Sequence, residues 1–212
     1  PVGPVIWDLN GVANERSALR RFSRVYGVCV MCPASHLEPG IVQAHATPIA
    51  GLLDIGRYPR GLDDVTKEIA EAFNASTFES RAVPEIMRWK YAKLMMNLGN
   101  SIEALTGSAE RAGELYSMAR REAITCLRAA NIDAASREED RERRGDRLQV
   151  KPIAGATRGG GSSWQSLARG TRSIEVDYLN GEIVLLGRLH GIETPVNALL
   201  QHLAREASAA GA

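Results

Sequence analysis

The sequence lacks long hydrophobic runs and a clear excess of either charge. No stretch of eighteen apolar residues occurs that could form a transmembrane helix, and the first residues do not have the pattern of a secretory signal peptide. The 26 Lys and Arg residues nearly balance the 25 Asp and Glu residues, which leaves a formal net charge of +1. This balance argues against a general electrostatic role at a nucleic acid or a membrane. With 212 residues, the chain can form one large or two small domains with a hydrophobic core.

Cysteine is scarce, and histidine shows no metal-binding pattern. The three cysteines, Cys29, Cys32 and Cys126, suit a reducing compartment better than a disulfide framework, so we expect a cytoplasmic protein. Cys29 and Cys32 have the C-x-x-C spacing of some metal and redox sites. There is no second pair, however, and residues three apart in a strand point to opposite faces. The four histidines also lack the spacing of metal ligands, and we expect no metal site.

The G-x-G-x-x-G fingerprint of dinucleotide-binding domains is also missing. The first third of the chain nevertheless alternates between strand and helix patterns. β-rich stretches occur at 4–7, 25–31, 41–47 and 52–58. Helical patterns occur at 14–22 and at 62–73, where Asp63 is a candidate N-cap. This alternation predicts part of an α/β sheet.

From Pro84 onward the pattern is almost wholly helical. One helix is expected to begin near Pro84 and a second to cover 109–130. The segment 136–147, SREEDRERRGDR, carries charges of both signs, which is typical of a solvated helix face or a mobile surface segment. We therefore predict one domain at 1–83 and a helical domain at 84–212.

A glycine run at 159–161 begins the most informative part of the sequence. Glycines favour a bend at which the backbone can approach a ligand closely, and one of the paired serines at 162–163 is expected to cap the next helix. The ordinary alternative is a flexible loop with a serine cap. The following apolar residues fall near helical spacing, with Glu175 near the start, where the helix dipole stabilises a carboxylate. Gly191 is expected to end this helix and Pro195 to begin the next.

Two motifs in this part resemble the ketopantoate reductase (2-dehydropantoate 2-reductase) family. The family has SSM-x-Q-D-x-x-x-G-x-x-T-E-I-D-x-L-N-G and, after a helix, H-G-(I/V)-x-T-P-x-N. This chain has SSWQSLARGTRSIEVDYLNG at 162–181 and HGIETPVN at 190–197. Asn10-Gly11-Val12 resembles the family's Q-N-G-x-G turn, which follows a Rossmann strand. The resemblance implies an α/β plus all-α chain. The 1–83 domain would be the last part of a Rossmann-like nucleotide-binding domain, without its N-terminal half, and the 84–212 domain a helical substrate-binding and dimerisation domain like the C-terminal domain of 6-phosphogluconate dehydrogenase.

The resemblance implies the NADPH-dependent reduction of a 2-keto acid, 2-dehydropantoate, by hydride transfer. Lys93-Leu94-Met95-Met96-Asn97 resembles the family's K-L-x-x-N motif, whose lysine is the general acid. A lysine suits this role because it can protonate the carbonyl oxygen and stabilise the charge that develops there. Asn97, one helical turn later, would share the face of Lys93 and contact the substrate. Without the motif, Lys93 would be an ordinary surface lysine and Lys90 its nearby competitor.

Three further residues receive roles from the resemblance. Ser163 and Asn10 match residues that contact the substrate, and Glu175 matches a catalytic glutamate that accepts a hydrogen bond from a substrate hydroxyl. Asn10 and Glu175 would also lie next to the NADPH. On sequence grounds alone, Asn10 is equally a turn asparagine that tolerates a left-handed conformation. The family also implies a homodimer formed through the helical domain.

The sequence departs from the family at several positions of the expected site. The second family asparagine, eight residues after the lysine, is Ser101 here, and Asn100 comes one residue early. On a continuous helix this shift would rotate the side chain by about 100°. Gly160 replaces an asparagine before the paired serines, and Ser166 replaces an acidic residue after Gln165. Two alternatives therefore stay open: a reductase of another 2-keto acid, or a non-catalytic helical dimerisation module that lacks the nucleotide fingerprint.

Overall fold

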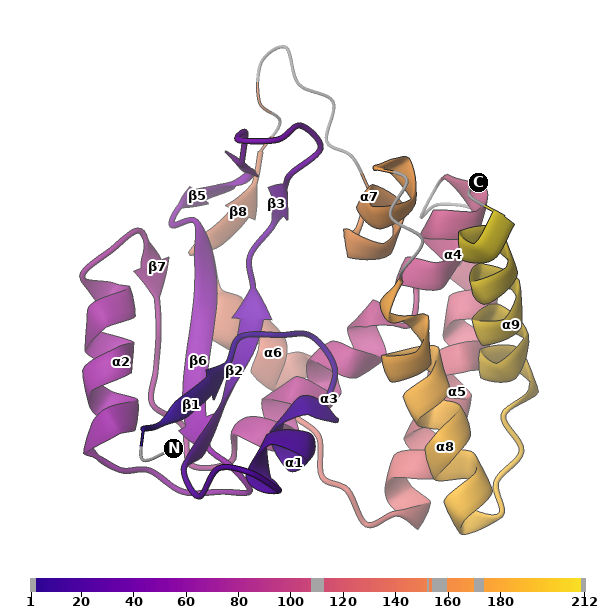
Figure 1. Cartoon of the computed structure of the whole chain (residues 1–212), viewed down its shortest axis with the longest axis horizontal. Coiled ribbons are helices and arrows are strands. Elements are labelled where there is room, and N and C mark those ends of the chain that lie inside the picture. The colour runs from indigo at the N-terminus through magenta and orange to yellow at the C-terminus, as the bar shows by residue number, and fades with distance from the viewer. Residues whose placement is uncertain (1–2, 108–112, 152, 154–159, 170–173, 211–212) are drawn as a thin grey trace. The chain divides into compact units, whose positions relative to one another are not determined.

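The computed structural model describes residues 3–107, 113–151, 153, 160–169 and 174–210. The chain divides into two compact units, which are described separately (Figure 1). The first unit comprises Pro1–Ala34, Gln43–Lys93 and Ala134–Thr157, and the second comprises Ser35–Val42, Leu94–Asp133 and Arg158–Ala212. Strands and helices alternate in the first unit and helices dominate the second, which confirms the expected α/β plus all-α fold class.

The predicted domain boundary and the compact units divide the chain differently. The units change after Lys93, within a helix, and the first unit also includes Ala134–Thr157. The sequence did not predict that 134–157 packs in the first unit, because a helical pattern does not show which unit a helix packs against. The functional division into a nucleotide-binding domain at 1–83 and a substrate-binding domain at 84–212 stays a prediction.

The first unit contains a four-stranded mixed sheet with the order β1-β2-β6-β7. Its strands are β1 (Val5–Trp7), β2 (Val25–Met31), β6 (Gly51–Arg57) and β7 (Phe78–Glu79). β2 pairs in parallel with β1 and antiparallel with β6, with Cys29 opposite Asp54, and β6 pairs in parallel with β7. The two long strands lie close to their predicted positions because each is an apolar run that is almost wholly buried.

Helices and shorter strands complete the first unit. The helices are α1 (Asn14–Leu19), α2 (Asp64–Asn74), α3 (Ile86–Asn97, which continues into the second unit) and α6 (Arg137–Arg144). The short strands are β3 (Ala34–Ser35), β4 (Gln43–Ala44), β5 (Ala46–Pro48) and β8 (Leu148–Val150). The single strand predicted at 41–47 is wrong, because two short strands, β4 and β5, occur there. Between them, the backbone N–H of His45 donates to the carbonyl of Pro33 (2.8 Å), and β5 pairs antiparallel with β8.

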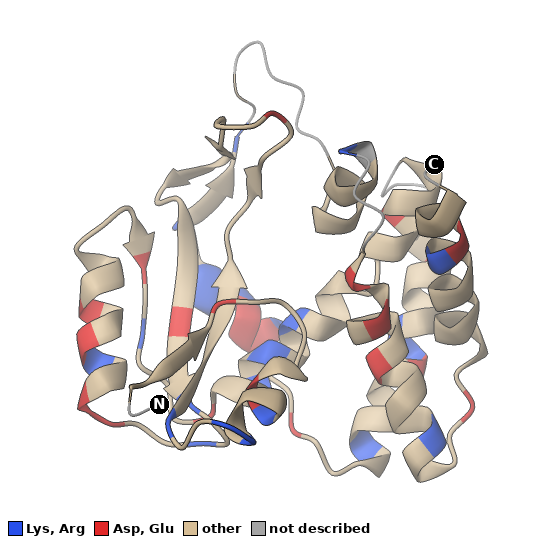
Figure 2. Ribbon diagram, viewed as in Figure 1, with Lys and Arg blue, Asp and Glu red and all other residues tan. Residues whose placement is uncertain are grey.

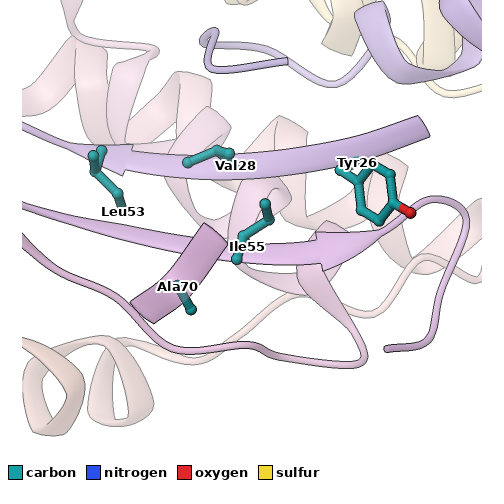
Figure 3. Close-up of a cluster of buried hydrophobic side chains, with 5 residues drawn as sticks. All are labelled: Tyr26, Val28, Leu53, Ile55 and Ala70. Atoms are coloured by element: carbon teal, nitrogen blue, oxygen red, sulfur yellow. The ribbon is translucent and has the colours of Figure 1, made fainter. Parts of the chain in front are cut away.

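One hydrophobic core lies where the sheet meets α2 (Figure 3). Its buried side chains come from the two long strands and the helix: Tyr26 and Val28 of β2, Leu53 and Ile55 of β6, and Ala70 of α2. Residues two apart in a strand point to the same face, so each strand contributes a pair. α2 has Asp63 as its N-cap, as predicted, and the Asp63 carboxylate accepts from the backbone N–H of Thr66 (3.1 Å). The same carboxylate accepts from the Tyr26 hydroxyl (2.7 Å), so the cap also fixes the helix against the sheet.

The charged segment at 136–147 is anchored to the sheet. It forms α6, which begins with a capping box at Ser136, and Figure 2 shows charges of both signs along it. Arg143 of this helix is only 5% exposed. Its guanidinium donates two hydrogen bonds to Asp54 of β6 (2.6 and 2.7 Å) and one to Glu79 of β7 (2.8 Å). Most of the segment is an exposed helix face, as predicted, but Arg143 departs from this pattern because it pairs with a buried carboxylate of the sheet.

The second unit is built from short and medium helices. They are α4 (Asn100–Thr106), α5 (Gly113–Ala129), α7 (Ser162–Ala168), the 3₁₀ helix η2 (Glu175–Tyr178), α8 (Asn180–His190) and α9 (Pro195–Ala210). Gly191, at φ = 68°, ends α8, and Pro195 begins α9, as predicted. The helix expected to start near Glu175 begins instead as the 3₁₀ turn. None of the helices that the structure describes is long and apolar enough to cross a membrane.

A buried polar cluster joins α5, α8 and α9. Glu122 of α5 accepts from the backbone N–H groups of Val196 and Asn197 (2.9 and 3.0 Å) and from the Asn197 side-chain amide (2.7 Å). The Asn197 side-chain oxygen in turn accepts from the Asn180 amide (3.1 Å). The carboxylate satisfies N–H groups at the start of α9 that have no partner within the helix. It therefore fixes the position at which α9 begins.

Candidate functional site

A small cavity of about 10 Å³, roughly the room for one water molecule, lies in the first unit. It is lined by Leu9, Asn10, Gly11, Val28, Cys29, Val30, Lys90 and Lys93. These residues come from the turn after β1, from β2 and from α3. The cavity brings together two predicted site residues, Asn10 and Lys93, and the competing lysine, Lys90.

The turn that carries Asn10 is closed by local interactions. The side-chain amide of Asn14 donates to the carbonyl oxygen of Asn10 (3.3 Å). The positive φ of this turn, 78°, belongs to Gly11, where the missing Cβ makes that conformation inexpensive. Among the described residues, Asn131 is the one non-glycine residue with a positive φ. A left-handed backbone is therefore not the reason for an asparagine at position 10.

The Lys90 ammonium is buried, and it lies close to a carboxylate and two backbone carbonyls of the protein. Its Nζ lies 2.7 Å from Glu15 Oε1, 2.8 Å from the carbonyl oxygen of Leu9 and 3.2 Å from that of Val28. The side chains of Lys90 and Glu15 are 2% and 0% exposed. Two of the three ammonium donors therefore bond backbone carbonyls, and the positive charge is paired with the adjacent carboxylate.

Lys93, about one helical turn later, lies in a different environment. Its side chain is half-buried, and burial lowers the pKa of its ammonium from the usual 10.5. The positive charge of Arg144 adds to this lowering of the pKa, and the negative charge of Asp140 opposes it. Burial raises the pKa of Cys29 to about 11, so the thiol is neutral at neutral pH. Within the described parts of the chain, the Lys93 ammonium has no hydrogen bond or ion pair.

These environments give the two lysines different chemical capacities. For Lys90 to bind an anion or release a proton, contacts with Glu15 and two carbonyls would have to break. Lys93 lines the cavity without a hydrogen bond or ion pair to a described residue, and its lowered pKa makes it a better proton donor near neutral pH than an ordinary lysine. The geometry therefore favours Lys93 over Lys90 as an acid at this cavity.

In the second unit, the glycine run is anchored by a residue that the sequence did not single out. Gly161 is the N-cap of α7, and its backbone N–H donates to Glu103 Oε2 (2.8 Å). The predicted serine cap is wrong, because Ser163 lies inside the first turn of α7 and no side chain caps this helix. A Cβ at Gly160 or at Gly161 would lie 2.9 Å from an oxygen of Glu103, and one at Gly160 would also lie 2.9 Å from Trp164 Cβ, so these positions leave little room for a side chain. Glu103 lies 58 residues before the loop and matches no motif, so the sequence offered no signal for it.

The helix that carries the family's asparagines is interrupted in this chain. α3 ends at Asn97, which is buried, and α4 begins at Asn100. The rotation of about 100° expected for a continuous helix therefore does not apply. Ser101 is buried, and its hydroxyl donates to the carbonyl of Leu98 (3.2 Å). Asn100 Oδ1 lies 3.3 Å from the place where a Cβ at Gly161 would be, so Asn100 is the residue that lies beside the glycine loop.

The five predicted site residues are distributed over both units. Asn10 and Lys93 line one cavity in the first unit. Asn97, Ser163 and Glu175 belong to the second unit, where Ser163 is buried and Glu175 is the half-buried first residue of η2. The roles assigned to these residues stay predictions.

Comparison with known proteins places the chain in a family. The family model described as "Ketopantoate reductase PanE/ApbA C terminal" matches residues 85–208, which is more than half of the chain. A 2-dehydropantoate 2-reductase of Pyrococcus horikoshii is 26% identical over 212 residues, an alignment that covers 95% of this chain and 66% of the relative. The chain spans 58% to 66% of the length of three curated relatives with that name.

Solved structures show the same relationship. A PanE/ApbA family ketopantoate reductase from Ralstonia eutropha is 26% identical, with a TM-score of 0.77, and the match covers 99% of this chain and 68% of that one. The ternary structure of D-mandelate dehydrogenase with NADH and anilino(oxo)acetate has a TM-score of 0.77 at 20% identity, covering 98% of this chain and 68% of that one. This second likeness shows the fold alone. With its helical part matched by the family model over residues 85–208, the chain belongs to the ketopantoate reductase family.

Proposed function

We propose that this chain acts in the NADPH-dependent reduction of 2-dehydropantoate to pantoate, with Lys93 as the general acid. The observation that carries the proposal is the contrast between the two lysines of the cavity. Lys90 bonds two backbone carbonyls and is ion-paired with Glu15, whereas Lys93 has a half-buried ammonium with a lowered pKa and no hydrogen bond or ion pair to a described residue. Asn10 lines the same cavity, at the end of a strand of the α/β sheet.

Lys93 would supply the proton that the reaction needs. A reduced nicotinamide, when bound, supplies a hydride to the keto carbon. The carbonyl oxygen then gains negative charge, and the Lys93 ammonium stabilises that charge and transfers a proton to it, which leaves a hydroxyl and a neutral amine. A desolvated ammonium is suited to both tasks. Burial strengthens its electrostatic interaction with the developing negative charge, and the lowered pKa lets it release its proton more readily.

The residues at the cavity fit the reactive end of such a cofactor. Asn10 offers a short amide side chain, and Gly11, at φ = 78°, leaves room because it has no side chain. We propose that Asn10 contacts both the nicotinamide and the keto group. The described residues contain no phosphate-binding fingerprint, so the choice of NADPH over NADH rests on the family resemblance.

The remaining proposed contacts come from the second unit. Asn97 and Ser163 would donate hydrogen bonds to the substrate, and the Glu175 carboxylate would accept from its terminal hydroxyl and lie next to the cofactor. The anchoring of Gly161 by Glu103 supports a fixed position for Ser163, two residues later. Fixed contacts of this kind hold the substrate in a reactive orientation.

The test is NADPH oxidation by the complete protein with 2-dehydropantoate, for the wild type and two lysine variants. We expect Lys93→Ala to lower kcat by about 10²- to 10⁴-fold, the usual contribution of a general acid. Lys67→Ala is the matched control, because Lys67 is exposed on α2 and pairs only with the exposed Asp64. Activity that survives Lys93→Ala undiminished would remove Lys93 as the acid. A wild type inactive with every 2-keto acid would favour the non-catalytic dimerisation module instead.

A second candidate is a reductase of another 2-keto acid. The observation that favours it is Ser101, whose hydroxyl donates to the carbonyl of Leu98, just before α4, and which lacks the amide of the family's asparagine. The absence of an asparagine at Gly160 points the same way. Specificity constants for a series of 2-keto acids decide between the two, because the true substrate must have the highest value.

We also propose a homodimer and a cytoplasmic location, as the family resemblance implies. α8 and α9 expose large apolar side chains at Leu185, Leu189, Leu199 and Leu203, which a second copy of the chain could cover. Light scattering after size exclusion should give twice the mass of one chain. A monomer at every concentration up to about 100 μM, well above the range of stable dimers, would contradict this proposal.

A further inference from the structure

The buried pair of Glu15 and Lys90 joins four separate segments of the first unit. Glu15 lies in α1 and Lys90 in α3. The Lys90 ammonium also donates to the carbonyl of Leu9, in the turn that carries Asn10, and to that of Val28 in β2. The ion pair thus connects α1 and α3 with the turn and with β2.

This pair is a poor device for stability alone. Both side chains are fully buried, and removing two charges from water costs several kcal/mol per ion, so an apolar pair of similar volume often stabilises a fold equally well or better. Neither oxygen of the Glu15 carboxylate forms a hydrogen bond with a described residue, although Oε1 lies 2.7 Å from the Lys90 Nζ. Its desolvation is therefore offset mainly by a single ion pair.

Strand β2 has a glycine at the position where the side chains of Glu15 and Lys90 pack against it. Gly27 of β2 faces the two side chains, and a Cβ there would lie 3.1 Å from Glu15 Oε1 and 3.3 Å from Lys90 Cδ. A glycine weakens the interior of a strand, because it adds backbone entropy and packs no side chain. Gly27 is therefore a less favourable strand residue than one with a side chain, but it leaves the space that the ion pair occupies.

We propose that Glu15 and Lys90 are positioning residues that fix the Asn10 turn beside Lys93 for the reaction. The inference rests on the proposed function. Lys90 bonds the Leu9 carbonyl, which belongs to the same peptide unit as the Asn10 N–H, and Lys93 follows Lys90 by about one turn of the same helix. Glu15 compensates the charge of Lys90, so that this ammonium can stay buried while Lys93 carries the reactive charge.

The test replaces the pair by apolar residues and measures stability, local order and turnover separately. The variants are Lys90→Met, the double variant Glu15→Leu/Lys90→Met, and Lys67→Met as the exposed control, all in the complete protein. The double variant should keep the urea midpoint of the wild type, because two apolar side chains fill the site. Hydrogen exchange at residues 9–11 should nevertheless become at least tenfold faster than in the wild type, while exchange in α2 stays unchanged. The value of kcat should fall by roughly 10- to 100-fold, with a smaller change in KM, as for a displaced contact of the reaction.

The readouts separate failure of this inference from failure of the proposed function. Unchanged exchange at residues 9–11 in both Lys90 variants would overturn the positioning role, whether or not the wild type is an active reductase. Full turnover by the stable double variant, together with loss of turnover in Lys93→Ala, would overturn it while the proposed function stands. If exchange at 9–11 is faster in the double variant but the wild type reduces no 2-keto acid, the structural half of the inference is supported and the proposed function is contradicted.

Discussion

The Arg143→Met substitution tests whether the charged segment 136–147 is part of the folded core. In the wild type, the Arg143 guanidinium donates to both oxygens of Asp54, at 2.6 and 2.7 Å, and to Glu79 at 2.8 Å. Asp54 is 4% exposed. After the substitution, its carboxylate keeps the bond from the Arg81 backbone N–H (2.9 Å) but loses its cation.

The expected cost follows from this uncompensated charge. Breaking a buried ion pair by removing one partner typically costs about 3–5 kcal/mol of the free energy of unfolding. The contact with Glu79 adds little, because Glu79 is partly exposed and also lies 3.4 Å from Arg147. Urea unfolding followed by circular dichroism measures the loss as a lower midpoint with an unchanged m-value.

Arg141→Met is the matched control, because Arg141 lies on the same helix but is exposed. Its free energy of unfolding should stay within about 0.5 kcal/mol of the wild type. A loss below about 1 kcal/mol in Arg143→Met, or equal losses in both variants, would refute the anchored helix. The segment would then be the solvated surface that its composition indicates.

Two further substitutions probe contacts that no sequence pattern reveals. Glu122→Ala should lower the free energy of unfolding by about 1–3 kcal/mol, because the N–H groups at the start of α9 lose their acceptor. The exposed Glu114 of the same helix gives the control, and an equal loss in Glu114→Ala would contradict the capping role. Gly27→Ala should cost about 1–3 kcal/mol and lower kcat, because its Cβ would press on the carboxylate of Glu15 and the stem of Lys90. A stable, fully active Gly27→Ala protein would show that the pair has room to move.

Much of the fold could be predicted because local chemistry determines it. The apolar run of β2 and the Asp63 cap of α2 depend on residues that are close in sequence, and both occur as predicted. Gly191 and Pro195 likewise mark the end of α8 and the start of α9 through their own backbone preferences. Each of these elements can therefore be predicted from a few neighbouring residues.

The rest depends on long-range pairing, which a single sequence does not show. Arg143 looks like its charged neighbours, and its burial follows only from Asp54, 89 residues away. Glu103 caps the glycine loop from 58 residues away, and it replaces the serine cap that local rules favour. The K-L-x-x-N motif favoured Lys93 over Lys90, but the burial of Lys90 against Glu15, 75 residues away, could not be predicted from local sequence.

The pH dependence of kcat/KM tests the central claim most directly. A general acid acts only when protonated, so the wild type should lose kcat/KM as the pH rises through the pKa of Lys93, which burial places below the usual lysine value of 10.5. The Lys93→Ala variant should have a low rate without this alkaline limb, and Lys90→Met should retain the limb at a reduced rate. An alkaline limb that persists unchanged in Lys93→Ala, or one that disappears in Lys90→Met, would contradict the assignment of Lys93 as the acid.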